Sequence, residues 1–73
     1  MEQYEKIEGY RKLTDEEISL MNRVKKHAEE VRKCLDMLES ADSIDKRWIA
    51  IGRTNLQQGF MAVIRAIARP TTF

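Results

Sequence analysis

The sequence predicts an all-α protein in which a short N-terminal helix precedes an antiparallel hairpin of two long helices. Apolar residues recur at steps of three and four along residues 14–40, a spacing that places them on one face of a helix. A second long segment, residues 44–69, contains no proline and ends just before Pro70, which cannot continue a helix. At 73 residues the chain is short enough to form a single domain, residues 1–73.

The first helix is expected over residues 2–8, a short charged segment that Gly9 interrupts. A helix of this length is marginal unless it docks on another element. The second helix, residues 14–40, has a clear start signal, because Thr14 stands three residues before Glu17 and the two side chains can form a capping box. At 1.5 Å per residue this helix would be about 40 Å long. That length suits a bundle formed between chains.

The third helix, residues 44–69, follows a turn at residues 40–43, where Asp42 or Ser43 is expected to cap it. Its last part, residues 60–68, is apolar on nearly every face. A helix of that kind is normally buried all round, and a two-helix hairpin cannot cover it. We therefore expect an interlocked homo-oligomer.

Gly52 and Gly59 lie seven residues apart on nearly one face of this helix. Glycine in a helix costs about 1 kcal/mol relative to alanine. Close packing against another helix would offset that cost, and so would access of a ligand to the backbone; we favour packing.

Charge is distributed unevenly along the chain, although the formal net charge is only +1. Residues 1–45 contain 8 Lys and Arg against 12 Asp and Glu, whereas residues 46–73 contain five cations and no acid. A nearly neutral chain is a poor general binder of nucleic acid. The basic segment can pair with acidic residues of a neighbouring helix, or it can bind a small anion.

The sequence offers little for catalysis or metal binding, so no enzyme activity, metal or cofactor is expected. His27 is the only histidine and Cys34, seven residues later, is the only cysteine, whereas a zinc site needs three or four ligands. The three glycines form no phosphate-binding loop. The single cysteine fits a reducing cytoplasm, and we expect neither a signal peptide nor a membrane span.

Three groups of residues are candidates for binding an anionic ligand with aromatic bases. Tyr10 precedes Arg11 and Lys12, Lys25 and Lys26 lie about three turns into the second helix, and Arg47 stands beside Trp48. An aromatic side chain can stack on a base while neighbouring cations bind phosphates. Each group also has a structural interpretation, in which the aromatic residues pack in a core and the lysines form a solvated face.

Residues 9–22 and 47–70, which include the run R-W-x-A-I-x-R-T…L-Q-Q-G-F-M, resemble the phage anti-CBASS sponge proteins. These small helical proteins sequester the cyclic oligonucleotide messengers of bacterial immunity. The matching stretches cover more than half of the chain, and residues 27–45 look shorter than in longer members. The resemblance implies a homohexamer of interlocked hairpins, acting in the cytoplasm of the host bacterium, with separate pockets for cyclic dinucleotides such as cyclic GMP-AMP and for cyclic trinucleotides.

The resemblance also assigns roles to individual residues. In the dinucleotide pocket, the stacking tyrosine of the family falls on Tyr10 and its phosphate-binding lysine on Lys25, with Lys26 as the next choice. In the trinucleotide pocket, an arginine falls on Arg47. A small hydroxyl residue of that pocket falls near His27, a departure from the family pattern, so dinucleotide binding is better supported than trinucleotide binding.

Two other classes of function remain open on the sequence alone. A small helical adaptor could dock its apolar third helix on a host protein, with no nucleotide ligand. A DNA-binding antirepressor is disfavoured by the near-neutral charge and would show steeply salt-dependent binding to duplex DNA.

Overall fold

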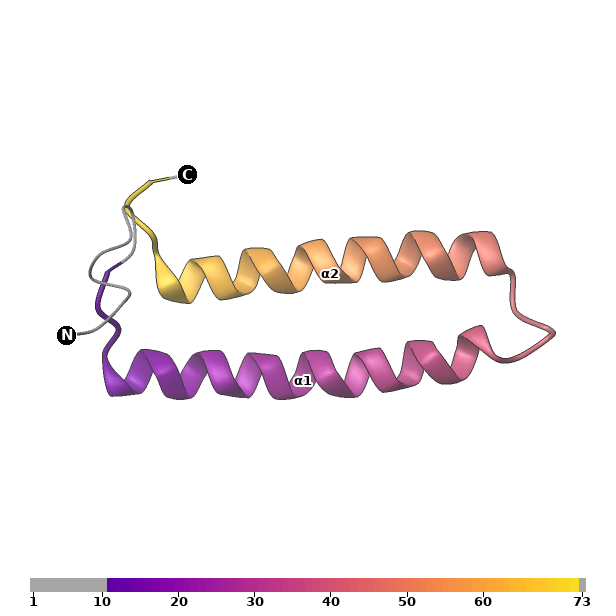
Figure 1. Cartoon of the computed structure of the whole chain (residues 1–73), viewed down its shortest axis with the longest axis horizontal. Coiled ribbons are helices and arrows are strands. Elements are labelled where there is room, and N and C mark those ends of the chain that lie inside the picture. Colours follow the sequence, from indigo (N-terminus) through magenta and orange to yellow (C-terminus); the bar gives the residue numbers. More distant parts are fainter. Residues whose placement is uncertain (1–10, 73) are drawn as a thin grey trace.

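The computed structural model describes residues 11–72 of the chain. Two helices, α1 (Asp15–Glu39) and α2 (Lys46–Ala68), form an antiparallel hairpin in which they lie side by side (Figure 1). No strand occurs in the described range. The predicted hairpin of two long helices is thus confirmed. The helix expected over residues 2–8 lies outside the described residues, and assembly into an oligomer stays a prediction.

The start of α1 follows the predicted capping box. The hydroxyl of Thr14 accepts a hydrogen bond from the Glu17 backbone N–H at 3.1 Å, and the Glu17 carboxylate accepts one from the Thr14 N–H at 2.9 Å. The first turn also carries three acidic residues, Asp15, Glu16 and Glu17. Their negative charge interacts favourably with the positive end of the helix dipole. The predicted cap is thus correct, and the helix begins at Asp15, one residue later than the predicted start at residue 14.

The start of α2 differs from the prediction. The cap is Asp45, not Asp42 or Ser43, and its carboxylate accepts hydrogen bonds from the backbone N–H groups of Arg47 and Trp48 at 3.0 and 3.1 Å. A carboxylate reaches the amides two and three residues ahead of it, and its charge also favours the positive helix end. The helix consequently starts at residue 46 instead of 44.

The C-terminal ends of the two helices are closed in different ways. Lys46 donates to the backbone carbonyls of Glu39 and Ala41 at the C-terminal end of α1, which supplies the cation that the last turn of α1 lacks. α2 ends at Ala68, and Arg69 adopts a left-handed conformation with φ 44°. Pro70 follows and has no N–H with which to continue the helix, so the predicted stop is correct to within one residue.

The seam between the helices contains the apolar stripe predicted for α1. Leu35 is the one buried hydrophobic residue among those described, and its stripe neighbours are half-buried: Met21, Val24, Ala28, Val31 and Leu38. Residues of α2, among them Phe60, Ile64 and Ile67, close the other side and are also only half-buried. One hairpin therefore gains little of the burial that stabilises a helical protein.

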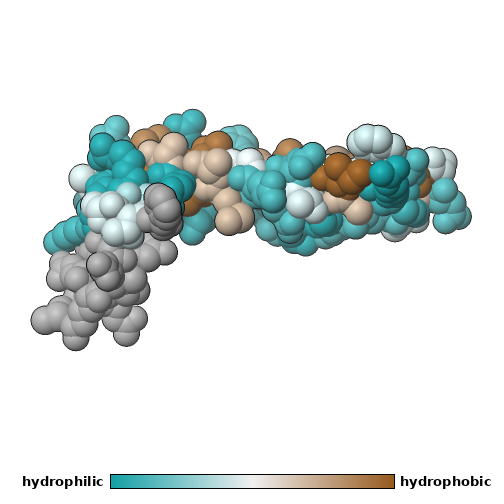
Figure 2. All heavy atoms as spheres, turned by 90° about the horizontal axis from the view of Figure 1, so that it is seen from above, coloured by the Kyte–Doolittle hydropathy of each residue, from teal (hydrophilic) through white to brown (hydrophobic). Residues whose placement is uncertain are grey.

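Large apolar side chains remain exposed on both helices. The most exposed are Met61, Met37 and Trp48, at 70%, 64% and 62%, and Ile18, Leu20, Leu56 and Val63 are exposed as well. Figure 2 views the hairpin from the α2 side, where hydrophobic side chains reach the surface between hydrophilic ones. So many exposed large apolar side chains on a short hairpin are typical of a surface that another molecule covers.

The two helical glycines do not bring α1 and α2 closer together. A Cβ added to Gly52 or to Gly59 would meet nothing within 4 Å. The expectation that these glycines allow close helix packing is therefore wrong within the hairpin, because the space beside each missing Cβ is open. Packing against another chain remains a prediction. None of the described helices is long and apolar enough to cross a membrane.

Candidate ligand-binding site

An open groove of about 740 Å³ runs along one side of the seam between α1 and α2. Its floor is apolar and is formed by both helices, with Leu35, Phe60 and Ile64 among the lining residues. Its charged lining residues are Lys25, Glu29, Arg32, Arg53 and Arg65. An apolar recess edged by a few charged groups is the general form of a small-molecule site.

Lys25, the lysine to which the resemblance gives the phosphate, lines this groove. It has no hydrogen bond or ion pair with any of the described residues, so its ammonium is available to an anion. Lys26 is exposed and lines neither this groove nor the smaller recess that contains His27. Of the two lysines considered, Lys25 is therefore the one that lines the groove between the helices.

His27 opens into a different, smaller recess of about 290 Å³, together with Leu20, Arg23, Val24 and Ile67. It lies two residues after Lys25, which corresponds to about 200° around a helix. Val24 lies between the two recesses and lines both. Lys25 and His27, which the resemblance assigns to different pockets, thus line separate recesses.

Arg11 is bound within the chain at the open end of the hairpin. Its guanidinium donates to both carboxylate oxygens of Glu17 and, at 3.1 Å, to the backbone carbonyl of Ile67. Arg69 also donates to Glu17 at 3.1 Å. The hydrogen bonds from Arg11 lower the pKa of the Glu17 carboxyl well below its usual range, and the same carboxylate raises the pKa of Arg11. Arg11 is therefore placed as a link between the connector and both helices.

Arg47 lies in the first turn of α2, at the turn end of the hairpin. Its guanidinium sits 5.9 Å from the centroid of the Trp48 ring, within the range of a cation–π interaction. The antiparallel arrangement puts this residue roughly 25 Å from Lys25 along the hairpin axis, at 1.5 Å of rise per residue. One hairpin does not bring these two candidate residues together. Tyr10, the candidate for stacking, lies outside the described residues.

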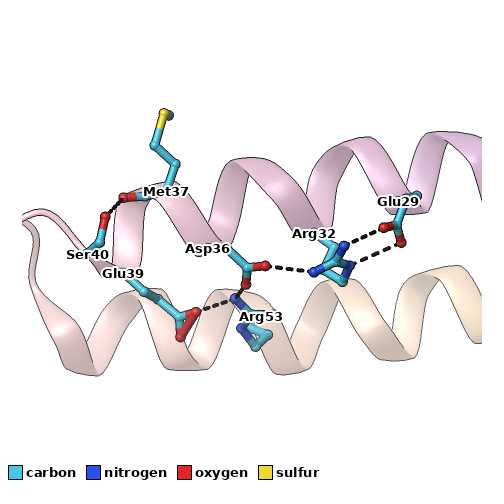
Figure 3. A network of polar contacts seen from close by, with 7 residues as sticks. All are labelled: Glu29, Arg32, Asp36, Met37, Glu39, Ser40 and Arg53. Carbon is cyan, nitrogen blue, oxygen red and sulfur yellow. Dashed lines mark hydrogen bonds and ion pairs between the residues drawn. The ribbon is translucent and has the colours of Figure 1, made fainter.

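A cluster of charged residues joins the two helices near the turn (Figure 3). Arg53 of α2 donates to Asp36 of α1 at 2.7 Å and also to Glu39. Arg32 donates to Asp36 at 2.7 Å and binds both carboxylate oxygens of Glu29. Figure 3 shows these side chains as one continuous series of contacts.

These contacts show which cations of the basic segment, residues 46–73, pair with acidic residues of the neighbouring helix. Arg53 and Arg69 both bind carboxylates of α1, so for them the pairing interpretation is confirmed. The acidic partners Asp36 and Glu39 were not singled out from the sequence. Their spacing of three residues on one face of α1 is the signal that could have identified a bridging site for an arginine.

The described residues define a small helical-hairpin protein with an unpaired lysine in an apolar groove, and they contain no cluster of three metal-ligand side chains. A family model for the Acb2/Tad1 hairpin domain matches residues 5–68, and the chain belongs to that family. Anti-CBASS protein 2 of Pseudomonas phage JBD67 is 30% identical over 102 residues, covering 93% of this chain and 94% of the relative. That alignment is longer than the 73 residues of this chain, so the relative carries residues without a counterpart here.

Proposed function

We propose that this protein inhibits CBASS immunity of the host bacterium by binding and sequestering cyclic oligonucleotide messengers without degrading them. The observation that carries the proposal is the family relationship, which extends over 93% of the chain to a relative named an anti-CBASS protein. The groove supports it, because it offers, beside an apolar floor, a lysine with no ion pair to any residue of the range 11–72. Bases and phosphates of a cyclic dinucleotide need these two kinds of surface.

The proposed ligand site forms between chains. A cyclic dinucleotide carries two phosphates related by a near twofold axis, whereas one hairpin contributes a single Lys25 and a single Tyr10. A symmetric interface presents each residue twice. Two copies would therefore provide one lysine for each phosphate and one tyrosine for each base. Cyclic trinucleotides are a second proposed ligand class, for which His27 and Arg47 are the candidate residues.

Assembly into a homo-oligomer, with six chains as the expected number, accounts for the exposed apolar surface. Met61 and Val63 of α2 are 70% and 47% exposed in the single hairpin, although they are apolar. Burial of apolar surface stabilises an assembly by about 25 cal/mol per Å². An interlocked arrangement would cover these side chains and enclose the ligand at the same time.

The proposed mechanism is stoichiometric. Each site removes one messenger from solution, so inhibition depends on the number of sites, on the dissociation constant and on slow release. Affinity differences among related complexes reside mainly in the dissociation rate. Burial of the ligand between chains excludes water and slows its release. No chemical step on the messenger is part of this mechanism.

Calorimetry with cyclic GMP-AMP tests the assignment of the lysine. Lys25→Ala is expected to weaken binding by at least about tenfold, because a charge-assisted hydrogen bond to phosphate contributes about 1.5–3 kcal/mol. Lys33→Ala is the matched control: Lys33 is also an exposed lysine of α1 but lines neither groove. Equal weakening in both variants would show only a general charge effect and would contradict the assignment.

A second candidate function is that of an adaptor which docks α2 on a host protein. The exposure of Met61 and Val63 favours it, since such side chains suit a protein interface. The two functions differ in their assembly and ligand. An adaptor would remain a single hairpin until its partner is added and would not bind cyclic nucleotides.

A further inference from the structure

Lys25 lies within reach of only one acidic residue on its own helix. Side chains three and four positions apart are neighbours on a helix, and for Lys25 these positions hold Met21, Asn22, Ala28 and Glu29. Glu29 is the one acid among them, and it lines the same groove as Lys25. Without another partner, the Glu29 carboxylate would be a competitor on α1 for the ammonium that is proposed to bind phosphate.

The structure keeps this carboxylate occupied elsewhere. Arg32 donates from Nε to Oε2 of Glu29 at 3.0 Å and from Nη2 to Oε1, so both oxygens are engaged in a bidentate pair. The hydrogen bonds from Arg32 lower the pKa of Glu29, because they stabilise its ionised form. Lys25, by contrast, makes no ion pair with any of the described residues.

Arg32 is linked to the second helix through Asp36 of its own helix. Its Nη1 donates to Asp36 at 2.7 Å, and the other oxygen of Asp36 accepts from Arg53 of α2, also at 2.7 Å. The series Arg53, Asp36, Arg32 and Glu29 in Figure 3 therefore extends from the bridge between the helices to the groove. The same residues that fix the hairpin also fix the orientation of the carboxylate beside Lys25.

We infer that Arg32 is a positioning residue for the anion site: by binding Glu29 it leaves the Lys25 ammonium unpaired and available to a phosphate of the ligand. This inference rests on the proposed function for the identity of the ligand. Arg32 also lines the groove, but in this inference it acts through Glu29 and not by contact with the phosphate. Its effect on affinity comes from the acid that it withdraws.

Lys33 adds a second competitor for Glu29, because it lies four residues after Glu29, the more favourable order for an acid–base pair on a helix. Its charge also contributes to the lowered pKa of that carboxyl. When Arg32 is removed, Glu29 is therefore expected to divide between Lys33 and the two lysines that precede it by three and four residues, Lys26 and Lys25. Removal of both Arg32 and Lys33 leaves only those two lysines as its neighbours on the helix, so contact with Lys25 becomes more frequent.

A series of variants titrated with cyclic GMP-AMP tests the inference. Lys33→Gln alone is expected to leave affinity unchanged, because Arg32 still holds Glu29. Arg32→Gln is expected to weaken binding about twofold, and Arg32→Gln/Lys33→Gln about threefold to fivefold, in keeping with the small energies of exposed ion pairs. Adding Glu29→Gln to the double variant is expected to restore most of the affinity, although it cannot restore the contact between Arg32 and Asp36.

Two results would overturn the inference. One is an affinity loss in Arg32→Gln/Lys33→Gln that Glu29→Gln does not reverse, since Arg32 would then act through the hairpin and not through Glu29. The other is a Lys25 resonance that does not move in lysine ¹⁵Nζ NMR spectra recorded without ligand. The inference expects this resonance to move in the double variant and to return in the triple variant. The NMR result does not depend on ligand binding; if cyclic GMP-AMP binds to none of the proteins, that result contradicts the proposed function instead.

Discussion

The guanidinium of Arg11 lies against the carboxylate of Glu17 and donates to both of its oxygens. Through this pair the connector before α1 is attached to the first turn of that helix, and through the carbonyl of Ile67 it is attached to the last turn of α2. Glu17 also accepts from Arg69 and from the Thr14 backbone N–H. One carboxylate thus joins both helices and the connector at the open end of the hairpin.

The stability of the protein is expected to fall in acid because of Glu17. Its pKa is lowered from 4.5 in the folded state, so its contribution to stability is present above pH 4.5 and is lost as the pH falls through the folded-state value. Glu17→Gln keeps a side chain able to complete the capping box but removes the charge. Urea denaturation should show the variant less stable than the parent at pH 7, with a smaller difference at pH 3.

Glu16→Gln is the control for this measurement, because Glu16 lies in the same turn and is exposed. The stability of this variant is expected to stay within about 0.5 kcal/mol of the parent protein at both pH values, because it loses one exposed charge and no ion pair of the described residues. A constant difference between Glu17→Gln and the parent from pH 7 to pH 3 would argue against the ion pair as the source of the acid sensitivity.

Asp45→Ala is expected to destabilise the protein by about 1 kcal/mol, the usual cost of losing a helix N-cap. The substitution leaves the backbone N–H groups of Arg47 and Trp48 without their acceptor. Asp42→Ala should change the free energy of unfolding by less than about 0.5 kcal/mol, as is normal for an exposed substitution away from such features. The reverse order in denaturant titrations would place the cap where the sequence suggested it.

Met61→Glu is expected to reduce the mass of the assembly measured by sedimentation. Met61 is 70% exposed in one hairpin, and a charge there would be costly to bury between chains. Asn55→Glu places the same charge on an exposed polar residue of α2 and should leave the assembly intact. A parent protein that sediments at the 8.6 kDa of one chain at micromolar concentration would rule out the proposed oligomer.

Tyr10→Ala is expected to abolish detectable binding of cyclic dinucleotides while the oligomer stays intact. Stacking of an aromatic side chain on a base contributes about 1–3 kcal/mol, and a symmetric site would lose it twice. Tyr10→Phe retains the ring and should retain most of the affinity. Calorimetry and sedimentation of the same samples check both parts; an alanine variant that loses its oligomer would assign Tyr10 to assembly.

Local signals in the sequence were enough to predict the start of α1 and its apolar face. Thr14 and Glu17 are three residues apart, so their capping box depends on nothing outside one turn. The start of α2 was harder, because Asp42, Ser43 and Asp45 are all suitable caps and the choice depends on the conformation of the turn. That conformation is decided by the whole hairpin.

The spacing of Asp36 and Glu39 could indicate a site for an arginine, but it could not predict which arginine of α2 binds there. Arg53 and Asp36 are separated by 17 residues, and they meet only because the turn sets the register of α2 against α1. Lys25 was chosen by resemblance, and the structure adds that it lines a groove and is unpaired within the described range. Its relation to Glu29 and Arg32 emerges only when side-chain contacts are known.

The measurement that tests the central claim most directly is the fate of the messenger. The purified protein is mixed with an equal amount of cyclic GMP-AMP, free small molecules are separated by chromatography, and the protein is then denatured by heat and the solution is run again. The account predicts that the ligand disappears from the free fraction and returns chemically intact after heating. A ligand that returns as linear products would show an enzyme, and one that never leaves the free fraction would contradict sequestration of this messenger.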